Sequence, residues 1–321
     1  MRKLGWHARC ILALFSTYVL GHQTALSAIA FVSRHVFRRP IASVFLLYPA
    51  RKEYADALAY QWHQRRFGWQ PGLVGLYRQG NRYGMIFGIP NFEDEIRLER
   101  TPEHLLHLMS QMERVRACVR AERKVFAGIL PSTFQRNGID DADLSDQREL
   151  TARAVLCALD QVTEANGLSE DVPILVLGGR GYIASEVIDR CTRPSVTSVD
   201  VGDIAEFEAL VARLHGRPLV VINLTKSGAL AEYTNRLWPG VIVLNEVYPE
   251  PTGPEIAALE QRGVTCYHIV GVAGQAWPPF PKAYRGGIPC CAALPVAQKD
   301  ALPVLVARLS LDGTRSFLQQ S

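Results

Sequence analysis

A short apolar run that ends in a cluster of glycines is the feature that most constrains the fold of this chain. The run spans residues 174–177, and the turn after it contains Gly178, Gly179, Arg180 and Gly181. A helical pattern begins at once after the turn. An apolar strand that turns sharply into a helix is the opening unit of a β-α-β fold.

The rest of the second half alternates short apolar runs with helical patterns. The apolar runs span residues 196–199, 219–222, 241–244 and 264–270. The helical patterns span residues 182–191, 204–214 and 253–261. Strands that are apolar along their whole length are typical of a parallel sheet covered by helices on both faces. We therefore predict an α/β protein of two domains, 1–145 and 146–321, the second a Rossmann-like, doubly wound parallel sheet with a last helix that returns to the first domain.

The spacing of the glycines predicts a dinucleotide site. Gly179 and Gly181, with Ala184 as the small third residue, match the dinucleotide fingerprint, and Gly178 gives a looser variant of it. Glycine allows the tight turn and the close approach of backbone amides to a pyrophosphate, whose charge the helix N-terminus attracts. A glycine-rich turn without a ligand is the alternative. The residues expected to bind the cofactor are Gly178, Gly179, Arg180, Gly181, Tyr182 and Ile183.

An acidic residue ends the second predicted strand. Asp200 lies 21 positions after Gly179. A carboxylate at this point binds the ribose diol of NAD and opposes the 2′-phosphate of NADP. Arg180 offsets this preference because it carries a positive charge beside the same pocket. The expected cofactor is therefore NAD or NADP, with NAD favoured.

Three segments of the second half resemble the shikimate dehydrogenases. Leu219 to Gly228 is similar to their Asn-x-Thr-x-x-Gly turn, and Asn245 to Thr252 is similar to their next strand and turn. Gly271 to Gln275 is similar to the segment after their last strand, which lies at the nicotinamide. The resemblance implies that Asn223, Thr225 and Gly271 contribute to the cofactor site.

The same elements occur in the long-chain acyl-(acyl carrier protein) reductases, and the first half resembles these more closely. The segments 82–88, 101–106 and 127–132 are similar to segments that occur in the same order in these reductases. The resemblance therefore covers roughly residues 75–300. Their catalytic cysteine lies in Ala-Cys-Phe-Ala-Glu, and Cys291 occupies the comparable place, with Leu294 where they have glutamate. The resemblance implies an NAD(P)-dependent oxidoreductase that reduces an acyl thioester or related carbonyl, with an acidic acyl carrier protein as a possible partner.

A thiolate suits this chemistry because it is strongly nucleophilic, and its pKa falls near cations or a helix N-terminus. Pro289 before Cys290 predicts a helix start at the two cysteines, with Lys282 and Arg285 close in sequence. Buried packing thiols are the alternative for Cys290 and Cys291. Tyr248 is a candidate proton donor or substrate-positioning group, whereas His268, in mid-strand, fits a core histidine better.

Two other functions stay open. The first is a shikimate-dehydrogenase-like alcohol or ketone enzyme with direct hydride transfer. The first half lacks that family's Ser-x-Ser and Asn-x-Thr-x-Pro-x-Lys, and before residue 150 its lysines are Lys3, Lys52 and Lys124. The second is a non-catalytic NAD(P)-binding sensor or partner subunit. Dependence of turnover on Cys291 separates the first alternative from the acyl reductase.

The N-terminal region is strongly basic. Residues 1–52 contain eight Lys and Arg and no Asp or Glu, and the remainder carries a net charge of −4. This imbalance indicates an acidic partner or an anionic membrane surface. Apolar residues at helical spacing predict a helix with one buried stripe: Ile11, Leu14, Phe15, Val19, Ala25, Ile29 and Val32. A core or dimer helix, an interfacial helix, and a signal or spanning segment are the three interpretations.

Other elements of the first half follow from local patterns. Residues 42–49 read as a strand, residues 72–88 as a hairpin, and residues 126–134 as a loop. Thr101 is expected to cap a helix that runs to about Val125, with Arg114, Arg116, Arg120, Arg123 and Lys124 on its exposed face. Ser145 is expected to cap the helix that enters the second domain.

Composition excludes several classes of protein. The 48% of apolar and 21% of charged residues exclude a disordered or multi-span membrane protein. Seven cysteines, an odd number, argue against a disulfide scaffold. The sequence contains no CxxC or HxxxH pair, so it gives no sign of a zinc site. We expect no metal and no nucleic acid, a cytoplasmic homo-oligomer, and possible peripheral contact with a membrane.

Overall fold

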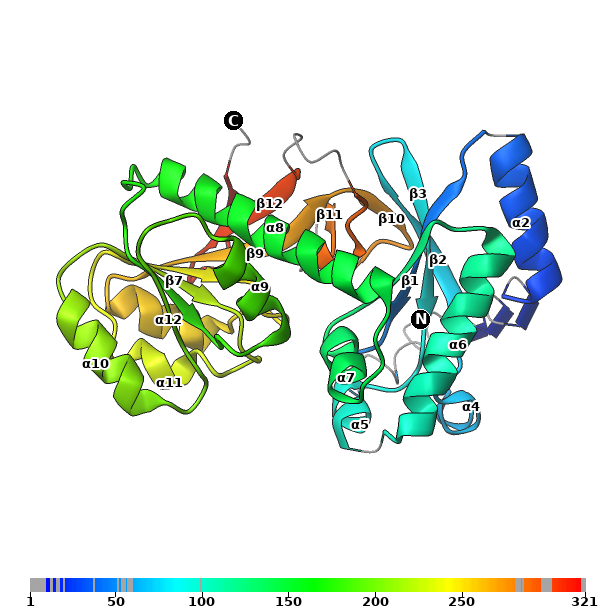
Figure 1. Cartoon of the computed structure of the whole chain (residues 1–321), viewed down its shortest axis with the longest axis horizontal. Coiled ribbons are helices and arrows are strands. Elements are labelled where there is room, and N and C mark those ends of the chain that lie inside the picture. The colour runs from blue at the N-terminus through cyan, green and yellow to red at the C-terminus, as the bar shows by residue number, and fades with distance from the viewer. Residues whose placement is uncertain are drawn as a thin grey trace. The chain divides into compact units, whose positions relative to one another are not determined.

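The computed structural model describes residues 10, 11, 14, 15, 18, 19, 21–36, 38–50, 52, 56, 60–98, 100–280, 284, 286–295 and 302–318. The chain divides into two units (Figure 1). Unit 1 comprises Met1–Gln147, Gly274–Phe280 and Cys291–Leu294, and unit 2 comprises Arg148–Ala273, Pro281–Cys290 and Pro295–Ser321. The main division therefore falls inside a long helix, α8 (Ala142–Ala165).

Unit 1 is built on a mixed sheet of five strands. They are β1 (Ile41–Leu47), β2 (Gly72–Gln79), β3 (Arg82–Gly88), β4 (Arg123–Phe126) and β10 (Gln275–Trp277), in the order β10-β2-β3-β1-β4. Strand β1 is parallel to β3 and β4, while β2 is antiparallel to β3 and β10. The turn between β2 and β3 contains Gly80 with φ of 56°, and the two strands form the hairpin that the sequence predicted.

The helices of unit 1 are α2 (Gln23–His35), α4 (Gln61–Phe67), α5 (Glu93–Leu98), α6 (Pro102–Val119), α7 (Leu130–Arg136) and the start of α8. Helix α6 begins with a capping box between Thr101 and His104. Its buried residues, among them Leu105 and Leu108, pack with Val44 and Met85 of the sheet to form one core.

Helix α2 differs from the expected pattern. Its buried residues are Leu26 and Ala30, with Ile29 packed beside them. Val32 is 41% exposed, and Ile11, Phe15 and Val19 are exposed as well. The prediction of one buried stripe is therefore wrong for these positions. Helix α2 buries Leu26 and Ala30, each one residue after a predicted position, so its buried face is rotated by about 100° from the predicted stripe.

Helix α6 ends at Val119, not near Val125 as expected. Arg120 adopts a left-handed conformation with φ of 54°, and the chain enters β4. There Arg123 and Lys124 pair with β1 and are 6% and 5% exposed. The prediction of an exposed charged face is wrong for these two residues, because acidic side chains hold Lys124 inside the unit.

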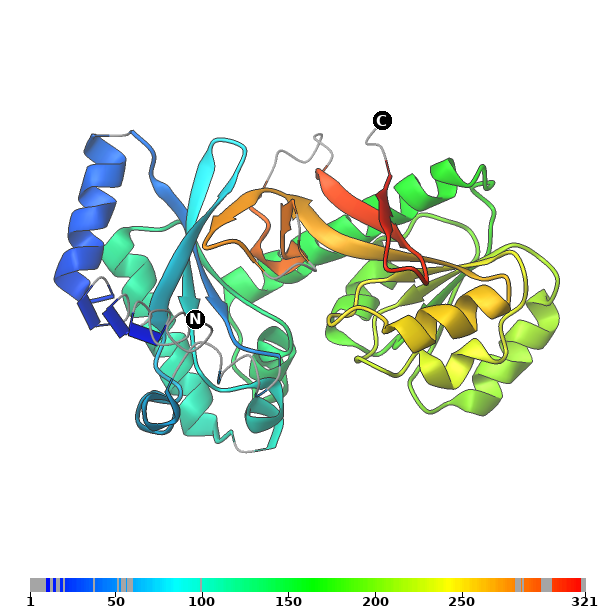
Figure 2. The ribbon, with the colours of Figure 1, turned by 180° about the vertical axis from the view of Figure 1, so that it is seen from behind.

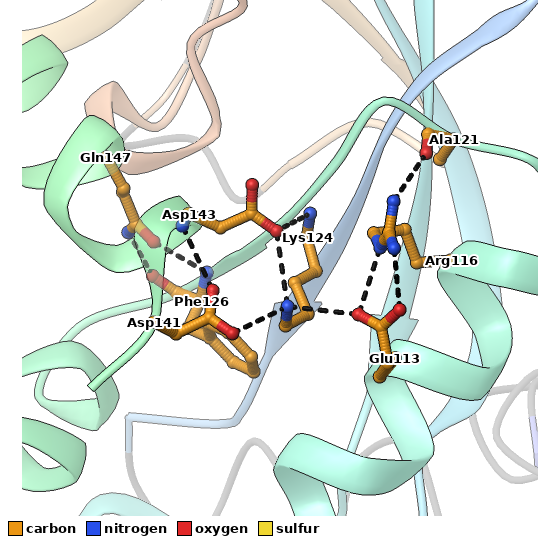
Figure 3. Close-up of polar contacts among 8 residues, drawn as sticks. All are labelled: Glu113, Arg116, Ala121, Lys124, Phe126, Asp141, Asp143 and Gln147. Carbon is orange, nitrogen blue, oxygen red and sulfur yellow. Dashed lines mark hydrogen bonds and ion pairs between the residues drawn. The ribbon is translucent and has the colours of Figure 1, made fainter. Parts of the chain in front are cut away.

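Three carboxylates surround the ammonium of Lys124 (Figure 3). Nζ lies 2.9 Å from Asp141, 3.1 Å from Glu113 and 3.3 Å from Asp143. Burial lowers the pKa of Lys124, but the bonds to Asp141 and Glu113 outweigh burial and raise it. All three N–H donors have an acceptor, so the cluster links α6, β4 and the start of α8.

Two further boundaries differ from expectation. The predicted loop after residue 126 contains α7, and α8 begins at Ala142 rather than after Ser145. Asp141 supplies the capping group, since its Oδ1 accepts a hydrogen bond from the Asp143 amide at 3.0 Å. Gln147 then pairs with both backbone groups of Phe126 (Figure 3), which fixes α8 against β4.

Unit 2 contains the predicted parallel sheet. Its strands are β5 (Ile174–Leu177), β6 (Val196–Val199), β7 (Leu219–Asn223), β8 (Val241–Asn245), β9 (Thr265–Ala273), β11 (Gly287–Ile288), β12 (Val304–Leu309) and β13 (Arg315–Phe317). The order is β13-β12-β9-β8-β7-β5-β6, and β11 pairs with β9. Strands β5 to β9 are parallel. The α/β class with a mostly parallel, Rossmann-like C-terminal sheet is confirmed.

Helices cover both faces of this sheet. On one face lie α10 (Ile204–Leu214), α11 (Ala231–Thr234) and α12 (Gly253–Gln261), seen together in Figure 2. Phe207, Tyr233 and Leu259 from these helices pack on Val221 and Val243 of the strands. On the other face lie α8 and α9 (Tyr182–Arg190) (Figure 1).

The predicted helix at the C-terminus is wrong in the described residues. Residues 304–309 form β12, which pairs antiparallel with β9, and residues 315–317 form β13. Val304 and Val306 are fully buried while Arg308 is exposed. β-Branched residues in this half-buried pattern fit a β-strand better than a helix.

Candidate functional site

Two predicted loops meet at the carboxyl ends of β5 and β7. In the strand order β6-β5-β7-β8-β9, the connections from β5 and β7 leave toward opposite faces of the sheet. Ligands of open α/β sheets bind at this topological switch point. A Cβ atom on Gly178 would lie 3.1 Å from the Leu224 carbonyl and 3.2 Å from Thr225 Cγ2. The structure therefore brings the glycine turn and Thr225 together.

Each glycine of the turn has a steric requirement. Gly178 has φ of 88°, and its amide donates to the Val199 carbonyl at 2.7 Å. A Cβ on Gly179 would lie 2.5 Å from both Cβ and Oγ of Ser198. A Cβ on Gly181 would lie 2.9 Å from the Gly178 carbonyl, which accepts the Gly181 amide at 2.8 Å. The turn is therefore as tight as the fingerprint requires.

Helix α9 begins directly after the turn. No side chain caps its N-terminus at Gly181, so the positive end of the helix is open to an anion. Arg148 of α8 braces the first turn, because it donates to the Tyr182 carbonyl at 2.7 Å and to Ser185 Oγ at 2.8 Å. Burial raises the pKa of Tyr182 to about 12, so its phenol stays neutral. Ile183 is half-buried.

Asp200 and Arg180 are paired. Oδ1 of Asp200 accepts the Arg180 amide at 2.8 Å, and the Asp200 carboxylate forms an ion pair with the Arg180 guanidinium. The Asp200 side chain is 24% exposed, whereas that of Arg180 is 88% exposed. Asp200 is thus fixed to the glycine turn, while the arginine has room to turn toward a ribose phosphate.

A chain of polar side chains runs from the carboxyl ends of β7 and β8 to the middle of β9. Thr225 Oγ1 donates to Asn223 Oδ1 at 2.6 Å, and Asn223 Nδ2 donates to Asn245 Oδ1 at 2.7 Å. Asn245 Nδ2 lies 3.0 Å from His268 Nδ1. Burial, followed by the charge of Arg315, lowers the pKa of His268 to about 4. The imidazole is therefore neutral near pH 7 and belongs to the core.

Sequence reasoning missed Glu246. It follows β8 directly, and its amide donates to the Asn223 carbonyl at 3.2 Å. Its side chain is half-buried, and burial raises the pKa of its carboxyl group to about 7. A carboxyl group that titrates near neutral pH at the end of a parallel strand is a candidate proton-transfer group. The signal in the sequence was a glutamate at the end of a fully apolar strand.

Tyr248 and Gly271 lie in unit 2. The Tyr248 ring centre is 4.9 Å from that of Tyr284, and the residue is half-buried. Gly271 has φ of 140°, and the Ile288 carbonyl occupies the place of a Cβ atom. This approach of β11 explains the need for glycine, and a role of Gly271 at the nicotinamide stays a prediction.

Cys291 lies in unit 1, whereas Cys290 belongs to unit 2. Residues 290–292 form a single 3-10 turn, so the predicted helix start is wrong. One turn aligns too few peptide dipoles to act as a helix N-terminus. Lys282 and Arg285 lie outside the described residues.

The buried Tyr77 and the half-buried Tyr48 lie in the electrostatic field of Cys291. Burial is the main cause that raises the pKa of Tyr48 and of Tyr77, and a negative charge on Cys291 raises both further. Tyr48 Oη accepts the Ile129 amide at 2.8 Å, so its own proton can be donated. Gly128 has no side chain at the position of the Tyr48 hydroxyl, which makes this contact possible.

Strand β2 holds the segment after Cys291. Gln79 Oε1 accepts the Leu294 amide at 2.7 Å, and Gln79 is buried. On the same strand Tyr77 passes over Gly84 and pairs with the Ser43 hydroxyl. Unit 1 therefore groups Cys291 with Tyr48 and Tyr77, while Tyr248 lies in the other unit. Among the described residues, no group of three His, Cys, Asp or Glu could hold a metal ion.

Comparison with known proteins gives distant structural likenesses. Neither a family model nor a curated protein matches the sequence. A shikimate dehydrogenase in complex with NADP+ is 12% identical over 72% of this chain and 85% of that chain, with a TM-score of 0.39. The hetero-hexameric glutamate dehydrogenase from Thermus thermophilus, in its Leu-bound form, is 13% identical over 71% and 64%, with a TM-score of 0.36. Scores this low carry no argument, so the fold assignment rests on the strand order.

Proposed function

We propose that this chain is an NAD(P)-dependent oxidoreductase that reduces an acyl thioester or related carbonyl through Cys291. The observation that carries the proposal is the glycine turn at the switch point. Its three glycines are each required by a close neighbour, and an uncapped helix follows. This combination suits a dinucleotide pyrophosphate better than an ordinary loop does.

The residues at the turn fit the cofactor. Gly178, Gly179 and Gly181 would let the pyrophosphate approach the backbone, and Asp200 with Arg180 would meet the ribose. Asn223 and Thr225 would face the crevice from β7. When bound, NADH or NADPH supplies a hydride. The exposed Arg180 and the fixed Asp200 serve NADP and NAD respectively, so both cofactors are candidates.

In this proposal Cys291 takes the acyl group. Its sulfur forms a bond to the thioester carbonyl carbon, and the carrier thiolate leaves. Tyr48 can donate its proton toward the carbonyl oxygen, because burial keeps the phenol protonated. Hydride addition at the acyl carbon then releases an aldehyde and restores the Cys291 thiolate. The acyl donor is coenzyme A or an acidic acyl carrier protein.

A trapped acyl adduct tests the proposal. The full chain is incubated with an acyl-coenzyme A and no cofactor, digested, and analysed by mass spectrometry. We expect an acyl mass on the peptide that contains Cys290 and Cys291. Cys291→Ser should lose the adduct and turnover yet keep cofactor binding, while Cys290→Ser, the matched control, should lose neither. Full turnover by Cys291→Ser would favour direct hydride transfer to a ketone instead.

One observation disfavours that rival. A shikimate-dehydrogenase-like enzyme needs a lysine in its first domain, and among the described residues of unit 1 the buried lysine is Lys124. Its ammonium is fully occupied by Glu113, Asp141 and Asp143.

Binding of NADH or NADPH without hydride transfer to any substrate would instead identify a non-catalytic sensor.

A further inference from the structure

Helix α2 and the residue after it carry exposed apolar side chains in addition to the buried stripe of the helix. Leu26 and Ala30 are buried in the core of unit 1, where α2 lies beside α6 (Figure 1). Phe31 and Val32 of α2, and Val36 directly after it, lie outside this buried stripe and are 62%, 41% and 66% exposed. A surface helix ordinarily carries polar residues on its outer side. These three side chains therefore need an explanation beyond the fold.

Exposed apolar residues concentrate in this part of the chain. Four more precede α2 and are 45–59% exposed: Ile11, Phe15, Tyr18 and Val19. Together with Phe31, Val32 and Val36 they form what we call the N-terminal apolar set. This set holds seven of the fifteen large exposed hydrophobic residues among those that the structure describes. Single exposed apolar residues are normal, but a concentration of this kind marks an interaction surface.

Cations accompany the N-terminal apolar set. Arg34 and Arg38 are exposed at the end of α2, and no Asp or Glu occurs in residues 1–52. Arg34 Nη2 reaches the Arg120 carbonyl at 3.5 Å, which adds a third exposed arginine nearby. The acids on and directly after α6 all have partners: Glu113 pairs with Arg116 and Lys124, and Glu122 pairs with Arg82. Glu103, at the start of α6, accepts a hydrogen bond from the Thr101 side chain. The surface is therefore apolar and positive.

We propose that the N-terminal apolar set and its arginines dock this protein on an anionic membrane surface. Apolar side chains enter the boundary between headgroups and acyl chains, while cations attract anionic lipids. No helix among the described residues is long and apolar enough to cross a membrane. This inference is independent of the proposed function, since it uses no residue of the candidate site.

The other occupants fit the surface less well. An acidic carrier protein would match the arginines but leave the apolar residues without a partner. A second copy would bury the apolar residues, but a symmetric contact would also place the arginines of both copies together. An anionic membrane satisfies both features at once.

Vesicle flotation tests the proposal with the full chain. The probes are phosphatidylcholine vesicles with and without phosphatidylglycerol, at low and at high salt. We expect binding to the anionic vesicles that weakens at least tenfold at high salt, because salt screens the arginines. The triple change Phe31→Ser, Val32→Ser, Val36→Ser should weaken binding at least tenfold at either salt concentration. Arg34→Gln with Arg38→Gln should remove most of the salt dependence.

Leu311→Ser is the matched control, because Leu311 is 56% exposed in unit 2. It should bind as the wild type does. An unchanged melting temperature of each variant excludes unfolding as the cause. Equal binding by the triple variant, or no binding to anionic vesicles, overturns the proposal. A dimer in light scattering that the triple change dissociates would assign the surface to a second copy. Capture of an acidic acyl carrier protein without vesicle binding would assign it to that partner.

Discussion

The substitution Gly179→Ala tests whether the tightness of the glycine turn matters for cofactor binding. The added Cβ would lie 2.5 Å from Cβ and Oγ of Ser198 on β6. Apolar carbon atoms prefer about 3.5–4.0 Å, so the turn or β6 must move by about 1 Å. The next atom, Ile188 Cδ1, is at 3.8 Å and is no obstacle.

Overpacking of this kind costs about 1–3 kcal/mol of unfolding free energy. In a domain of about 150–250 residues this lowers the melting temperature by roughly 2–10 °C. The displaced turn should also bind NADH and NADPH about tenfold more weakly, equivalent to about 1.4 kcal/mol. Chemical denaturation measures the first effect, and calorimetric titration with each cofactor measures the second.

The double variant Gly179→Ala, Ser198→Gly removes the clash. Ser198→Gly alone should cost about 0.5–1 kcal/mol, because glycine loosens a strand. The double variant should match that single change, which gives a coupling of about 1–3 kcal/mol between the two sites, equal to the cost of Gly179→Ala alone. If Gly179→Ala binds both cofactors as tightly as wild type, or if Ser198→Gly brings no rescue, the steric reasoning is wrong.

Three further predictions address charge. In titrations, Asp200→Ala should weaken the binding of NADH more than that of NADPH, because it removes the carboxylate expected to bind the ribose and frees Arg180 for the 2′-phosphate. Equal losses of affinity for the two cofactors would contradict this role of Asp200. Lys124→Met should lower the unfolding free energy by about 2–4 kcal/mol, because three carboxylates lose their cation, whereas Lys52→Met, at an exposed ion pair, should cost less than about 1 kcal/mol in the same denaturation assay. The carboxyl pKa of Glu246 is raised to about 7 on folding, so it binds a proton more tightly in the folded state, and its contribution to stability is lost as pH rises from about 4.5 to 7. Between pH 5 and pH 8 the unfolding free energy of Glu246→Gln should therefore rise by about 2–3 kcal/mol relative to that of wild type. A difference in unfolding free energy that stays constant with pH would show that the pKa shift is absent.

The second half of the chain was largely predictable from its sequence. Helices 204–214 and 253–261 and strands 174–177 and 196–199 have the predicted bounds. These elements are short, apolar and bounded by glycine, proline or a capping residue, so local patterns define them.

The first half depends on contacts that are distant in sequence. Residues 123–125 read as the end of a helix with Arg123 and Lys124 on its exposed face, and Phe126 read as the start of a loop. They form a buried strand because Glu113, Asp141 and Asp143 accept the Lys124 ammonium. Such a pairing leaves no local signal.

The surroundings of Cys291 also depend on contacts between residues that are distant in sequence. Tyr48 and Tyr77 lie more than 200 positions before Cys291 in the sequence. Tyr77 requires glycine at Gly84, and Tyr48 together with a φ of 55° requires glycine at Gly128. A single sequence names the cysteine, but only the folded sheet shows which hydroxyl groups accompany it.

Cofactor binding at the glycine turn is the central claim, and calorimetric titration of wild type and Gly181→Val tests it most directly. A side chain at Gly181 would meet the Gly178 carbonyl, with its Cβ at 2.9 Å, and would block the approach of a pyrophosphate. Wild type should bind NADH or NADPH and gain thermal stability through that binding. Gly181→Val should remain folded, with the circular dichroism of wild type, and lose the binding. A folded wild type that binds neither cofactor at millimolar concentration, or a Gly181→Val variant that binds as tightly as wild type, would contradict the account.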